Sequence, residues 1–462
     1  MEAPLVGPAV STAMDTIVAV ATPPGRSAIG VIRLSGPQSL GILRVLTRDQ
    51  SFTPEPNRIV LKAIVGESGQ PLDSALVSFF RGPHSFTGED MVEISCHGSP
   101  VILRQVLDLI QQQDARLADP GEFTLRACKN GKMNLTQAEA IRDLINAQTD
   151  AAAVQAARQL RGELSLALQP ARESLVHIIV KLESALEFVE DDLPAVQVTK
   201  IAVQLREVLR TIQQLAATYS SGHLLREGLK VAIVGRPNVG KSSVFNRLVR
   251  LDRAIVTDIA GTTRDSITES ISLRGIPISL TDTAGIRKAS DRIEEIGVER
   301  SHRAMADADL LVVVIDGSTG LLAEDQDVLS QAKNAKHLIA VNKCDLPQSS
   351  LENQLAGPSP VVHVSALTSE GLDNLTTAIL APFGTVDSER VGLLVTDSRH
   401  YDLLRRTESS LEESLMALRD GASEELVLVG LHNALRFLGE ITGETTTEDI
   451  LAEIFSTFCI GK

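Results

Sequence analysis

The residues with the most specific chemical meaning form one glycine-rich run, Gly235-Arg236-Pro237-Asn238-Val239-Gly240-Lys241-Ser242. It matches the phosphate-loop pattern G-x-x-x-x-G-K-[ST], and it lies between an apolar stretch and a helical one at 243–249, as that pattern requires. Backbone N–H groups of such a loop can wrap a phosphate chain, and the start of the helix adds a favourable dipole. We expect Lys241 to reach the β- and γ-phosphates, Ser242 to bind Mg²⁺ and Ser243 to contact the nucleotide. The alternative is a chance glycine-rich turn.

Three further motifs follow in order, each directly after an apolar stretch: Asp282-Thr283-Ala284-Gly285, Asn342-Lys343-Cys344-Asp345 and Ser365-Ala366-Leu367. Asp282 can hold magnesium through a water molecule, and Gly285 can donate its N–H to the γ-phosphate. Asp345 can accept two hydrogen bonds from the N1–H and N2–H₂ edge of guanine, which adenine lacks, and the Ala366 N–H can meet guanine O6. Because a buried carboxylate left unpaired by the wrong base is costly, the motifs together predict a GTPase. The set resembles the translation-factor-like GTPase superfamily.

Two other segments bear on hydrolysis. Between the first two motifs lies Thr257-Asp258-Ile259-Ala260-Gly261-Thr262-Thr263-Arg264-Asp265, where we expect Thr263 to complete the magnesium shell; the alternative is a solvated turn. Gly285 is followed by Ile286, where Ras-like GTPases have a glutamine that orients the attacking water. Isoleucine cannot do this, so a carboxylate of residues 290–295 is a candidate, although spacing alone favours solvated acids at a helix start.

Alternating strands and helices must position these motifs. Between about 223 and 385 the apolar stretches are 229–234, 276–280, 310–315, 337–341 and 361–364, which predicts parallel βα units. From about 14 to 130, short apolar runs separated by Gly and Pro predict an α+β domain, with strands expected at 16–21, 28–34, 75–80 and 91–95. Helical spacing dominates from about 134 to 220 and again after 390, and Pro170 and Pro194 are expected near helix junctions. Two arrangements stay open: four consecutive modules, or a nucleotide domain inserted into a helical one.

The composition restricts the class of protein. The 462 residues include 44 Lys and Arg against 59 Asp and Glu, and this net charge of −15 argues against binding nucleic acid through net charge alone. Any RNA contact would need a local basic patch or a basic partner. Four cysteines without a CxxC pair favour a reducing compartment over a disulfide framework or a zinc finger. With no membrane-length apolar run and no signal peptide, we expect a cytoplasmic protein with no membrane association and a loose extension over residues 1 to about 13.

Further stretches make the chain similar to the MnmE (TrmE) family of bacterial tRNA-modification GTPases over residues 14–462. They are Asp15-Thr16-Ile17-Val18-Ala19, Thr22-Pro23-Pro24-Gly25-Arg26, Phe86-Thr87-Gly88-Glu89-Asp90, His97-Gly98, Pro120-Gly121-Glu122-Phe123-Thr124 and Phe458-Cys459-Ile460-Gly461-Lys462. The resemblance implies a multidomain fold. Residues 1–130 would form an N-terminal α+β domain that binds tetrahydrofolate and dimerises. Residues 131–222 and 389–462 would form a discontinuous all-α helical domain, with a Ras-like α/β P-loop GTPase domain, 223–388, inserted between its parts.

The resemblance also implies an activity. The family acts as a potassium-activated GTPase with the flavoprotein MnmG, in a heterotetramer or larger complex. It adds an aminomethyl-type (carboxymethylaminomethyl) group to C5 of the wobble uridine of certain tRNAs, with 5-formyl- or methylene-tetrahydrofolate as the one-carbon donor. The GTPase domains of a homodimer pair when GTP and potassium are present. The alternative is a regulatory GTPase that cycles between GTP and GDP and times the assembly of another complex, such as a ribosomal intermediate.

The same resemblance implies roles for individual residues at the GTPase site. Potassium ligands are expected from Asn238, Thr257, Ile259 and Thr262, since a monovalent cation beside the phosphates can neutralise developing charge. Glu294 matches the water-orienting acid of the family, and Lys241 and Arg264 are expected to support catalysis. The nucleotide is further expected to contact Asp258, Ala260 and Gly261, along with the phosphate loop and the three later motifs.

A second implied site binds folate. Arg33, Glu93, Lys132 and Lys462 match the family's folate contacts: a carboxylate can pair the N–H donors of a pterin, and basic groups can meet its glutamate tail. Without the resemblance, Glu93 would be interpreted as a strand residue and Lys462 as a frayed terminus. Cys459 has two interpretations. It is either a small buried apolar residue or a catalytic thiol near the folate, reactive only if its pKa is depressed.

Overall fold

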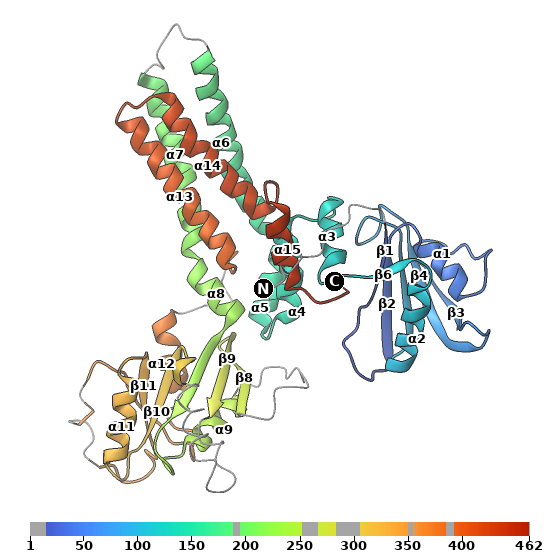
Figure 1. Ribbon diagram of the computed structural model, residues 1–462. Coiled ribbons are helices and arrows are strands. Elements are labelled where there is room, and N and C mark those ends of the chain that lie inside the picture. The colour runs from blue at the N-terminus through green and yellow to red at the C-terminus, as the bar shows by residue number, and fades with distance from the viewer. Residues whose placement is uncertain are drawn as a thin grey trace, which may run out of the picture. The chain divides into compact units, whose positions relative to one another are not determined.

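The computed structural model describes residues 15–187, 195–251, 267–282, 305–349, 354–355, 357–384 and 392–461. The chain forms two compact units (Figure 1). The first unit takes residues up to Arg142 together with those from Thr442 to the C-terminal end, and the second takes Asp143–Ile441. The C-terminal segment therefore packs with the N-terminal part of the chain. The expected domain boundaries at 130, 222 and 388 remain predictions.

A six-stranded sheet forms the base of the first unit. In spatial order its strands are β3 (Ile59–Val65), β4 (Pro71–Phe80), β5 (Met91–His97), β2 (Ile29–Ser35), β1 (Thr16–Val20) and β6 (Ala115–Leu117). Neighbouring strands are antiparallel except β1 and β6, which are parallel. The four strands expected in this region overlap β1, β2, β4 and β5 and are confirmed, whereas β3 and β6 lie outside the expected runs.

Two groups of helices complete the first unit. Helices α1 (Ser39–Leu46) and α2 (Pro100–Gln111) bury apolar side chains in one core with the strands. Helices α3 (Glu122–Lys129), α4 (Leu135–Asn146) and α15 (Glu448–Ser456) contribute to a smaller core that contains Leu135, Phe455 and Phe458. This smaller core holds the C-terminal segment in the first unit.

A helical bundle in the second unit is built from two separate parts of the chain. Helices α6 (Glu163–Glu187), α7 (Ala195–Ala217), α13 (Ser398–Arg419) and α14 (Glu424–Thr442) share one buried core. Two shorter helices, α5 (Asp150–Leu160) and α8 (Tyr219–Glu227), precede α6 and follow α7. Helix α7 begins directly after Pro194, as expected. The expected junction at Pro170 is wrong: this residue lies inside α6, where burial of Leu168, Ala171 and Leu175 offsets the missing backbone hydrogen bond.

The other part of the second unit is a sheet with helices on both faces. Its strands are β12 (Val361–His363), β11 (His337–Asn342), β10 (Leu310–Asp316), β7 (Leu229–Val234), β9 (Ile276–Asp282) and β8 (Ile267–Leu273), in that spatial order. All neighbours are parallel except β8 and β9. The five strands expected here are confirmed, and β8 is an additional edge strand.

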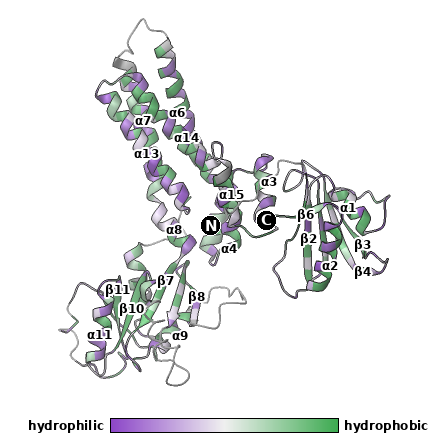
Figure 2. Cartoon of the chain, viewed as in Figure 1, coloured by the Kyte–Doolittle hydropathy of each residue, from purple (hydrophilic) through white to green (hydrophobic). Residues whose placement is uncertain are grey.

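Both faces of this sheet are buried. Alternate residues of β7 and β10 belong to two different cores, one with α9 (Lys241–Leu251) and α12 (Leu372–Leu380), the other with α11 (Ala323–Ala332). The short helix η1 (Ala381–Phe383) follows α12. Burial on both faces explains why these strands are apolar at nearly every position, as the colouring of β7 and β10 in Figure 2 shows. In the described ranges, no helix has the length and apolar character needed to cross a membrane.

Candidate functional site

The phosphate-loop run begins at the carboxyl end of β7, the strand between β10 and β9. Because β7, β9, β10, β11 and β12 are parallel, their carboxyl ends share one edge of the sheet. The other described motifs begin at the same edge. Asp282 ends β9, Asn342 ends β11, and Ser365 lies two residues after β12. This is the edge at which parallel α/β sheets bind ligands, beside the strand where the order reverses.

Two glycines shape the phosphate loop by close contact with neighbouring segments. Gly235 has a φ of 150° and Gly240 a φ of 96°. A Cβ atom on Gly240 would lie 2.3 Å from Nδ2 of Asn342, and one on Gly235 would lie 2.4 Å from the carbonyl oxygen of Val314. Neither position has room for a side chain. Asn238, between them, also has a positive φ, of 66°.

The side chain of Lys241 folds back across the loop. Its Nζ donates hydrogen bonds of 2.8 Å to the carbonyls of Gly235 and Arg236, and the residue is buried. Ser242 and Ser243 are exposed at the start of α9, and Asp282 is buried at the end of β9. A lysine, serine hydroxyls at a helix start and a carboxylate provide the donor and acceptor groups that nucleotide phosphates and Mg²⁺ require.

Asn342 connects two of the motif loops. Its Nδ2 donates to the carbonyl of Val239 at 2.9 Å, and its Oδ1 accepts from the N–H of Ala366 at 3.0 Å. The N–H expected to meet guanine O6 is therefore engaged by Asn342. The adjacent Lys343 has a φ of 67° and donates through Nζ to the carbonyl of Asn238 at 3.4 Å. The phosphate loop and the two base-side loops thus form one hydrogen-bonded assembly.

The guanine-selecting candidate, Asp345, is held by a second motif. The hydroxyl of Ser365 donates to Oδ1 of Asp345 at 2.5 Å, and Ser365 itself is fully buried. Asp345 is exposed, so one face of the carboxylate remains open to solvent. Arg247 of α9 donates to the carbonyls of Ala366 and Leu367 at 2.8 and 2.7 Å. The loop that carries Ser365 is therefore held from both sides.

Three residues without a role expected from the sequence support this assembly: Asp316, Arg236 and Arg247. Asp316 ends β10 and accepts from Lys343 Nζ at 2.5 Å. Burial alone would raise the pKa of Asp316, but hydrogen bonds from Lys343 and Ser318 hold it below its ordinary value. Arg236 of the phosphate loop donates to the buried Asp325 at 3.0 Å, and Arg247 holds the 366–367 carbonyls. The position of Asp316 directly after an apolar strand, like that of Asp282, was the available sequence signal.

Several expected site residues lie outside the described residues, and their roles remain predictions. They are Thr257, Asp258, Ile259, Ala260, Gly261, Thr262, Thr263, Arg264, Thr283, Ala284, Gly285, Glu294 and Lys462.

A second candidate site lies in the first unit. Arg33 of β2 and Glu93 of β5 are paired across neighbouring strands, and the guanidinium contacts Oε1 of Glu93 from Nε at 2.9 Å and from NH2 at 2.7 Å. The NH1 group of Arg33 also donates to the carbonyl of Gly461 at 3.2 Å. The rings of Phe86 and Phe123 have their centroids 5.7 and 5.9 Å from the guanidinium carbon. The structure thus brings two expected folate residues next to the C-terminal motif.

The other two described residues of this site lie nearby in the chain's first unit. Lys132 donates through Nζ to the carbonyl of Pro83 at 2.8 Å, in the loop that carries Phe86. The carbonyl of Cys459 accepts from the N–H of Gly121 at 3.4 Å, whereas the residue itself is exposed. The interpretation of Cys459 as a buried apolar residue is therefore wrong, because the segment packs through Phe455 and Phe458 instead.

Comparison with known proteins identifies the family. A family model described as the MnmE helical domain matches residues 135–459, and one described as the GTP-binding protein TrmE N-terminus matches residues 16–132. A tRNA modification GTPase MnmE from Koribacter versatilis is 46% identical over 453 residues, covering 97% of this chain and 99% of the relative. The protein of the same name from Aquifex aeolicus is 43% identical over 449 residues, covering 97% of this chain and all of the relative.

Solved structures match a smaller part. Era from Aquifex aeolicus is 24% identical with a TM-score of 0.29, covering 39% of this chain and 66% of Era. The G domain of T. maritima FeoB is 28% identical with a TM-score of 0.25, covering 33% of this chain and 97% of the domain. These TM-scores are too low to support a conclusion. The family models and the near-complete coverage of the relatives do support one: the chain belongs to the MnmE family of tRNA modification GTPases.

Proposed function

We propose that this protein is a GTPase that acts in tRNA modification. The observation that carries the nucleotide assignment is the Asn342 side chain, which joins the phosphate loop to the loop of Ser365 and Ala366. The hydrogen bond from Ser365 to Asp345 orients a carboxylate beside that junction. A carboxylate in this position selects guanine, because adenine has no N1–H and N2–H₂ edge to offer.

The residues present suit GTP and Mg²⁺. The phosphate loop would bind the phosphates through its backbone N–H groups and Lys241, with Ser242 and Asp282 holding the metal directly or through water. Bound Mg²⁺ neutralises phosphate charge. Thr263 would complete the metal shell, and Glu294, which matches the water-orienting acid of the family, would orient the attacking water.

We further propose that potassium activates hydrolysis and that the GTPase domain acts as an insertion in the helical domain of a homodimer. Asn238 and the segment of Thr257, Ile259 and Thr262 would supply the potassium ligands. The shared core of α6, α7, α13 and α14 supports the insertion, because these helices precede and follow the sheet in the chain. The partner in tRNA modification would be MnmG, with the wobble uridine as the substrate. This partner would supply much of the tRNA affinity, since the chain carries a net charge of −15.

The first unit would bind a reduced folate, 5-formyl- or methylene-tetrahydrofolate. Glu93 is suited to the N–H donors of a pterin, and Lys132 and Lys462 to the carboxylates of its glutamate tail. The support is the pairing of Arg33 with Glu93 and the contact of Arg33 with Gly461. Bound folate supplies the one-carbon unit. Cys459 would be an exposed thiol near that unit.

The first experiment measures steady-state GTP hydrolysis by the full chain in KCl and in NaCl at matched ionic strength, across a range of protein concentrations. Activation in KCl with a specific activity that rises with concentration is expected, because cation binding and pairing of GTPase domains act together. Asn238→Ala should remove the activation, and Asn334→Ala, an exposed residue of the same unit, should keep it. Equal rates in both salts at every concentration would exclude potassium activation and leave an ordinary guanine-nucleotide switch.

The second experiment separates the modifying enzyme from a regulatory switch. Binding of 5-formyl-tetrahydrofolate is measured by calorimetry for the wild type, for Glu93→Gln and for Glu55→Gln, whose carboxylate is in an exposed ion pair with Arg58. If the protein is the modifying enzyme, the wild type and Glu55→Gln should bind the folate with the same affinity. Glu93→Gln should bind it at least about 10-fold more weakly, because a charge-assisted hydrogen bond is lost. A wild type that does not bind the folate removes the folate assignment and favours the switch.

A further inference from the structure

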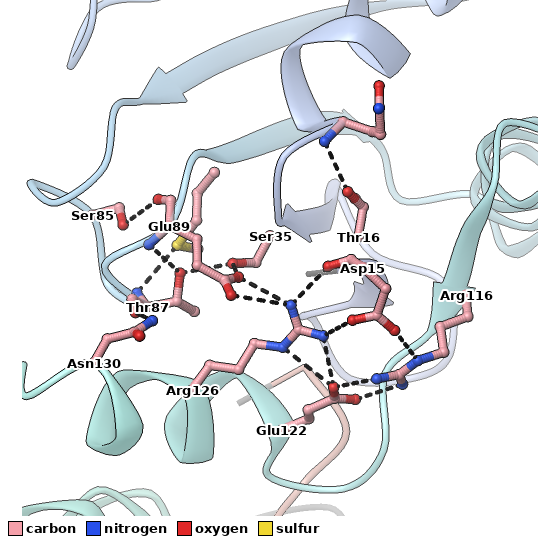
Figure 3. Close-up of polar contacts among 12 residues, drawn as sticks. Asp15, Thr16, Ser35, Ser85, Thr87, Glu89, Arg116, Glu122, Arg126 and Asn130 are labelled. Atoms are coloured by element: carbon pink, nitrogen blue, oxygen red, sulfur yellow. Dashed lines mark hydrogen bonds and ion pairs between the residues drawn. The ribbon is translucent and has the colours of Figure 1, made fainter. Parts of the chain in front are cut away.

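Arg126 of α3 is the centre of an ion network that is separate from the nucleotide site (Figure 3). Its guanidinium donates to Asp15 at the carbonyl oxygen (2.9 Å) and at Oδ1 (2.6 Å), and to Glu122 Oε1 at 2.9 Å. It also donates to both carboxylate oxygens of Glu89, at 3.2 and 3.1 Å. Only 12% of the Arg126 side chain is exposed. One largely buried cation thus joins the start of β1, the start of α3 and the loop between β4 and β5.

A second arginine, Arg116, binds two of the three carboxylates. Arg116 of β6 donates to Asp15 Oδ2 at 2.6 Å and to the two oxygens of Glu122 at 2.8 and 2.5 Å. Burial would raise the pKa of Asp15 and of Glu122, but hydrogen bonds from the two arginines hold both below their ordinary values. The carboxylates therefore stay ionised at neutral pH. Charge-assisted hydrogen bonds of this kind are about twice as strong as neutral ones.

The loop of residues 81–90 depends on this network and on the residues that follow α3. Glu89 accepts from Ser35 Oγ at 2.7 Å in addition to Arg126. Asn130 donates to the carbonyl of Thr87 at 2.7 Å, and Lys132 donates to the carbonyl of Pro83 at 2.8 Å. The attachments along the loop thus come from two sides: from α3 and its C-terminal extension, and from Ser35 and Gly36 at the end of β2.

The loop and α3 each carry one of the aromatic rings beside Arg33. Phe86 belongs to the loop, Phe123 belongs to α3, and both rings lie within 6 Å of the Arg33 guanidinium carbon. Arg33 in turn binds Glu93 and the carbonyl of Gly461. The spacing between loop and helix therefore sets the surroundings of the Arg33–Glu93 pair.

We propose that Arg126 is a positioning residue for the Arg33–Glu93 site: by binding Glu89 of the loop and Glu122 of α3, it sets the spacing of Phe86 and Lys132 relative to Arg33. Arg126 makes no contact with the ligand in this role. The proposal rests on the proposed function for the identity of the ligand, a reduced folate. Lysine cannot replace Arg126, since one ammonium group lacks the planar fork that reaches three carboxylates.

The test compares two ion pairs of Arg126 in the full chain. Glu89→Gln removes the charge of the Arg126–Glu89 pair, which reaches the loop, and keeps an oxygen for Ser35. Asp15→Asn weakens the Arg126–Asp15 pair, which does not involve the loop. Binding of 5-formyl-tetrahydrofolate is measured by calorimetry, thermal unfolding by circular dichroism, and hydrogen exchange of the amides of 82–90 by mass spectrometry. Arg158→Gln, which breaks a pair with Glu163 in the second unit, is the control for a lost ion pair.

We expect Glu89→Gln to weaken folate binding at least about 10-fold and to speed exchange in 82–90, because a charge-assisted bond to that loop is lost. Asp15→Asn should change folate affinity less than about 2-fold, since the ion pair between Arg126 and Glu89 of the loop persists. This should hold even if its unfolding temperature falls as far as that of Glu89→Gln. Arg126→Lys should not restore the affinity lost in Arg126→Gln. If the folate affinity of the variants falls in proportion to their unfolding temperature, whichever ion pair is changed, the proposal is wrong.

The failure of this proposal can be told from the failure of the folate assignment. A wild type that binds folate, together with a Glu89→Gln variant that binds it equally well, contradicts the positioning role and leaves the assignment intact. A wild type that binds no folate contradicts the assignment, and hydrogen exchange then decides the positioning role. Unchanged exchange in 82–90 on Glu89→Gln refutes it, and faster exchange there with unchanged exchange in Arg158→Gln supports it.

Discussion

The side-chain amide of Asn342 donates a hydrogen bond of 2.9 Å to the carbonyl of Val239, a residue 103 positions earlier in the chain. The oxygen of the same amide accepts from the N–H of Ala366. Asn342 is buried, as are its two hydrogen bonds, so its loss would leave two buried backbone groups without this partner. One side chain therefore couples the phosphate end of the site to the base end.

Replacing Asn342 with alanine should weaken GDP binding by about 10- to 100-fold, since one or two buried hydrogen bonds are lost at about 1–3 kcal/mol in total. Calorimetric titration with GDP measures the effect. Asn334→Ala, an exposed asparagine of the same unit, should bind like the wild type. Unchanged affinity in Asn342→Ala would mean that the two loops hold their positions without the bridge.

Replacing Asp345 with asparagine should reduce GTP affinity and favour xanthosine triphosphate. The amide presents a donor where the carboxylate accepted, and xanthine has an acceptor at position 2 where guanine has an amino group. Hydrolysis rates with both nucleotides measure the exchange of specificity. A variant that loses GTP without gaining the xanthine nucleotide would remove Asp345 from base recognition.

Replacing Glu294 with alanine should lower the turnover of GTP at least about 10²-fold, the scale of a lost general base, with nucleotide binding nearly intact. Single-turnover hydrolysis and GDP titration together separate the two effects. Glu295→Ala, the adjacent acid, is the matched control and should retain most of the activity. An equal loss of binding and turnover in Glu294→Ala would place the water-orienting group elsewhere.

The four cysteines should differ widely in reactivity. Burial raises the pKa of Cys96 and of Cys128 to about 12, so thiolate is scarce at neutral pH, whereas Cys459 is exposed. In native protein at pH 7.5, a disulfide reagent should label Cys459 first and leave Cys96 and Cys128 unlabelled until the chain unfolds. Mass spectrometry after brief labelling identifies the site. Labelling of Cys96 as fast as Cys459 would contradict the described packing.

Asp397 should make stability depend on acid pH. Burial alone would raise its pKa, but the charges of His400 and Arg226, with hydrogen bonds from Arg226 and from the Arg399 N–H, hold the pKa below its ordinary value. The folded state therefore favours the ionised form. The Asp397 carboxylate therefore stabilises the folded state fully at pH values above its pKa in the unfolded chain, about 3.9. This stabilisation is lost as the pH falls from there toward the lower pKa of the folded state.

Asp397→Asn should lower the free energy of unfolding at pH 7 by about 1.5–3 kcal/mol, because Arg226 loses one of its carboxylate partners and the start of α13 loses a charged one. The difference in free energy of unfolding between the wild type and Asp397→Asn should become smaller as the pH falls from 5 to 3. Thermal unfolding followed by circular dichroism across this range measures it. Asp402→Asn, from an exposed pair with Arg406, should show no comparable gap. A gap that stays constant with pH would contradict the depressed pKa.

Much of the second unit follows from local pattern. Strands buried on both faces need continuous apolar residues, and loops that bind phosphate need glycine at tight positions, so both are visible in a few consecutive residues. For this reason the five expected parallel strands are confirmed. Pro170 could not be interpreted in the same way, because its place inside α6 depends on a core shared with α13 and α14.

The order of the motifs, the strands before them and, through resemblance, the family can be predicted from the order of amino acids. Which distant residues meet depends on the folded chain. Arg33 contacts Gly461 from 428 positions away, and Arg126 binds Asp15 from 111. Such contacts depend on the order of strands in a sheet and on which helices share a core, and these are set by burial summed over many residues rather than by local spacing.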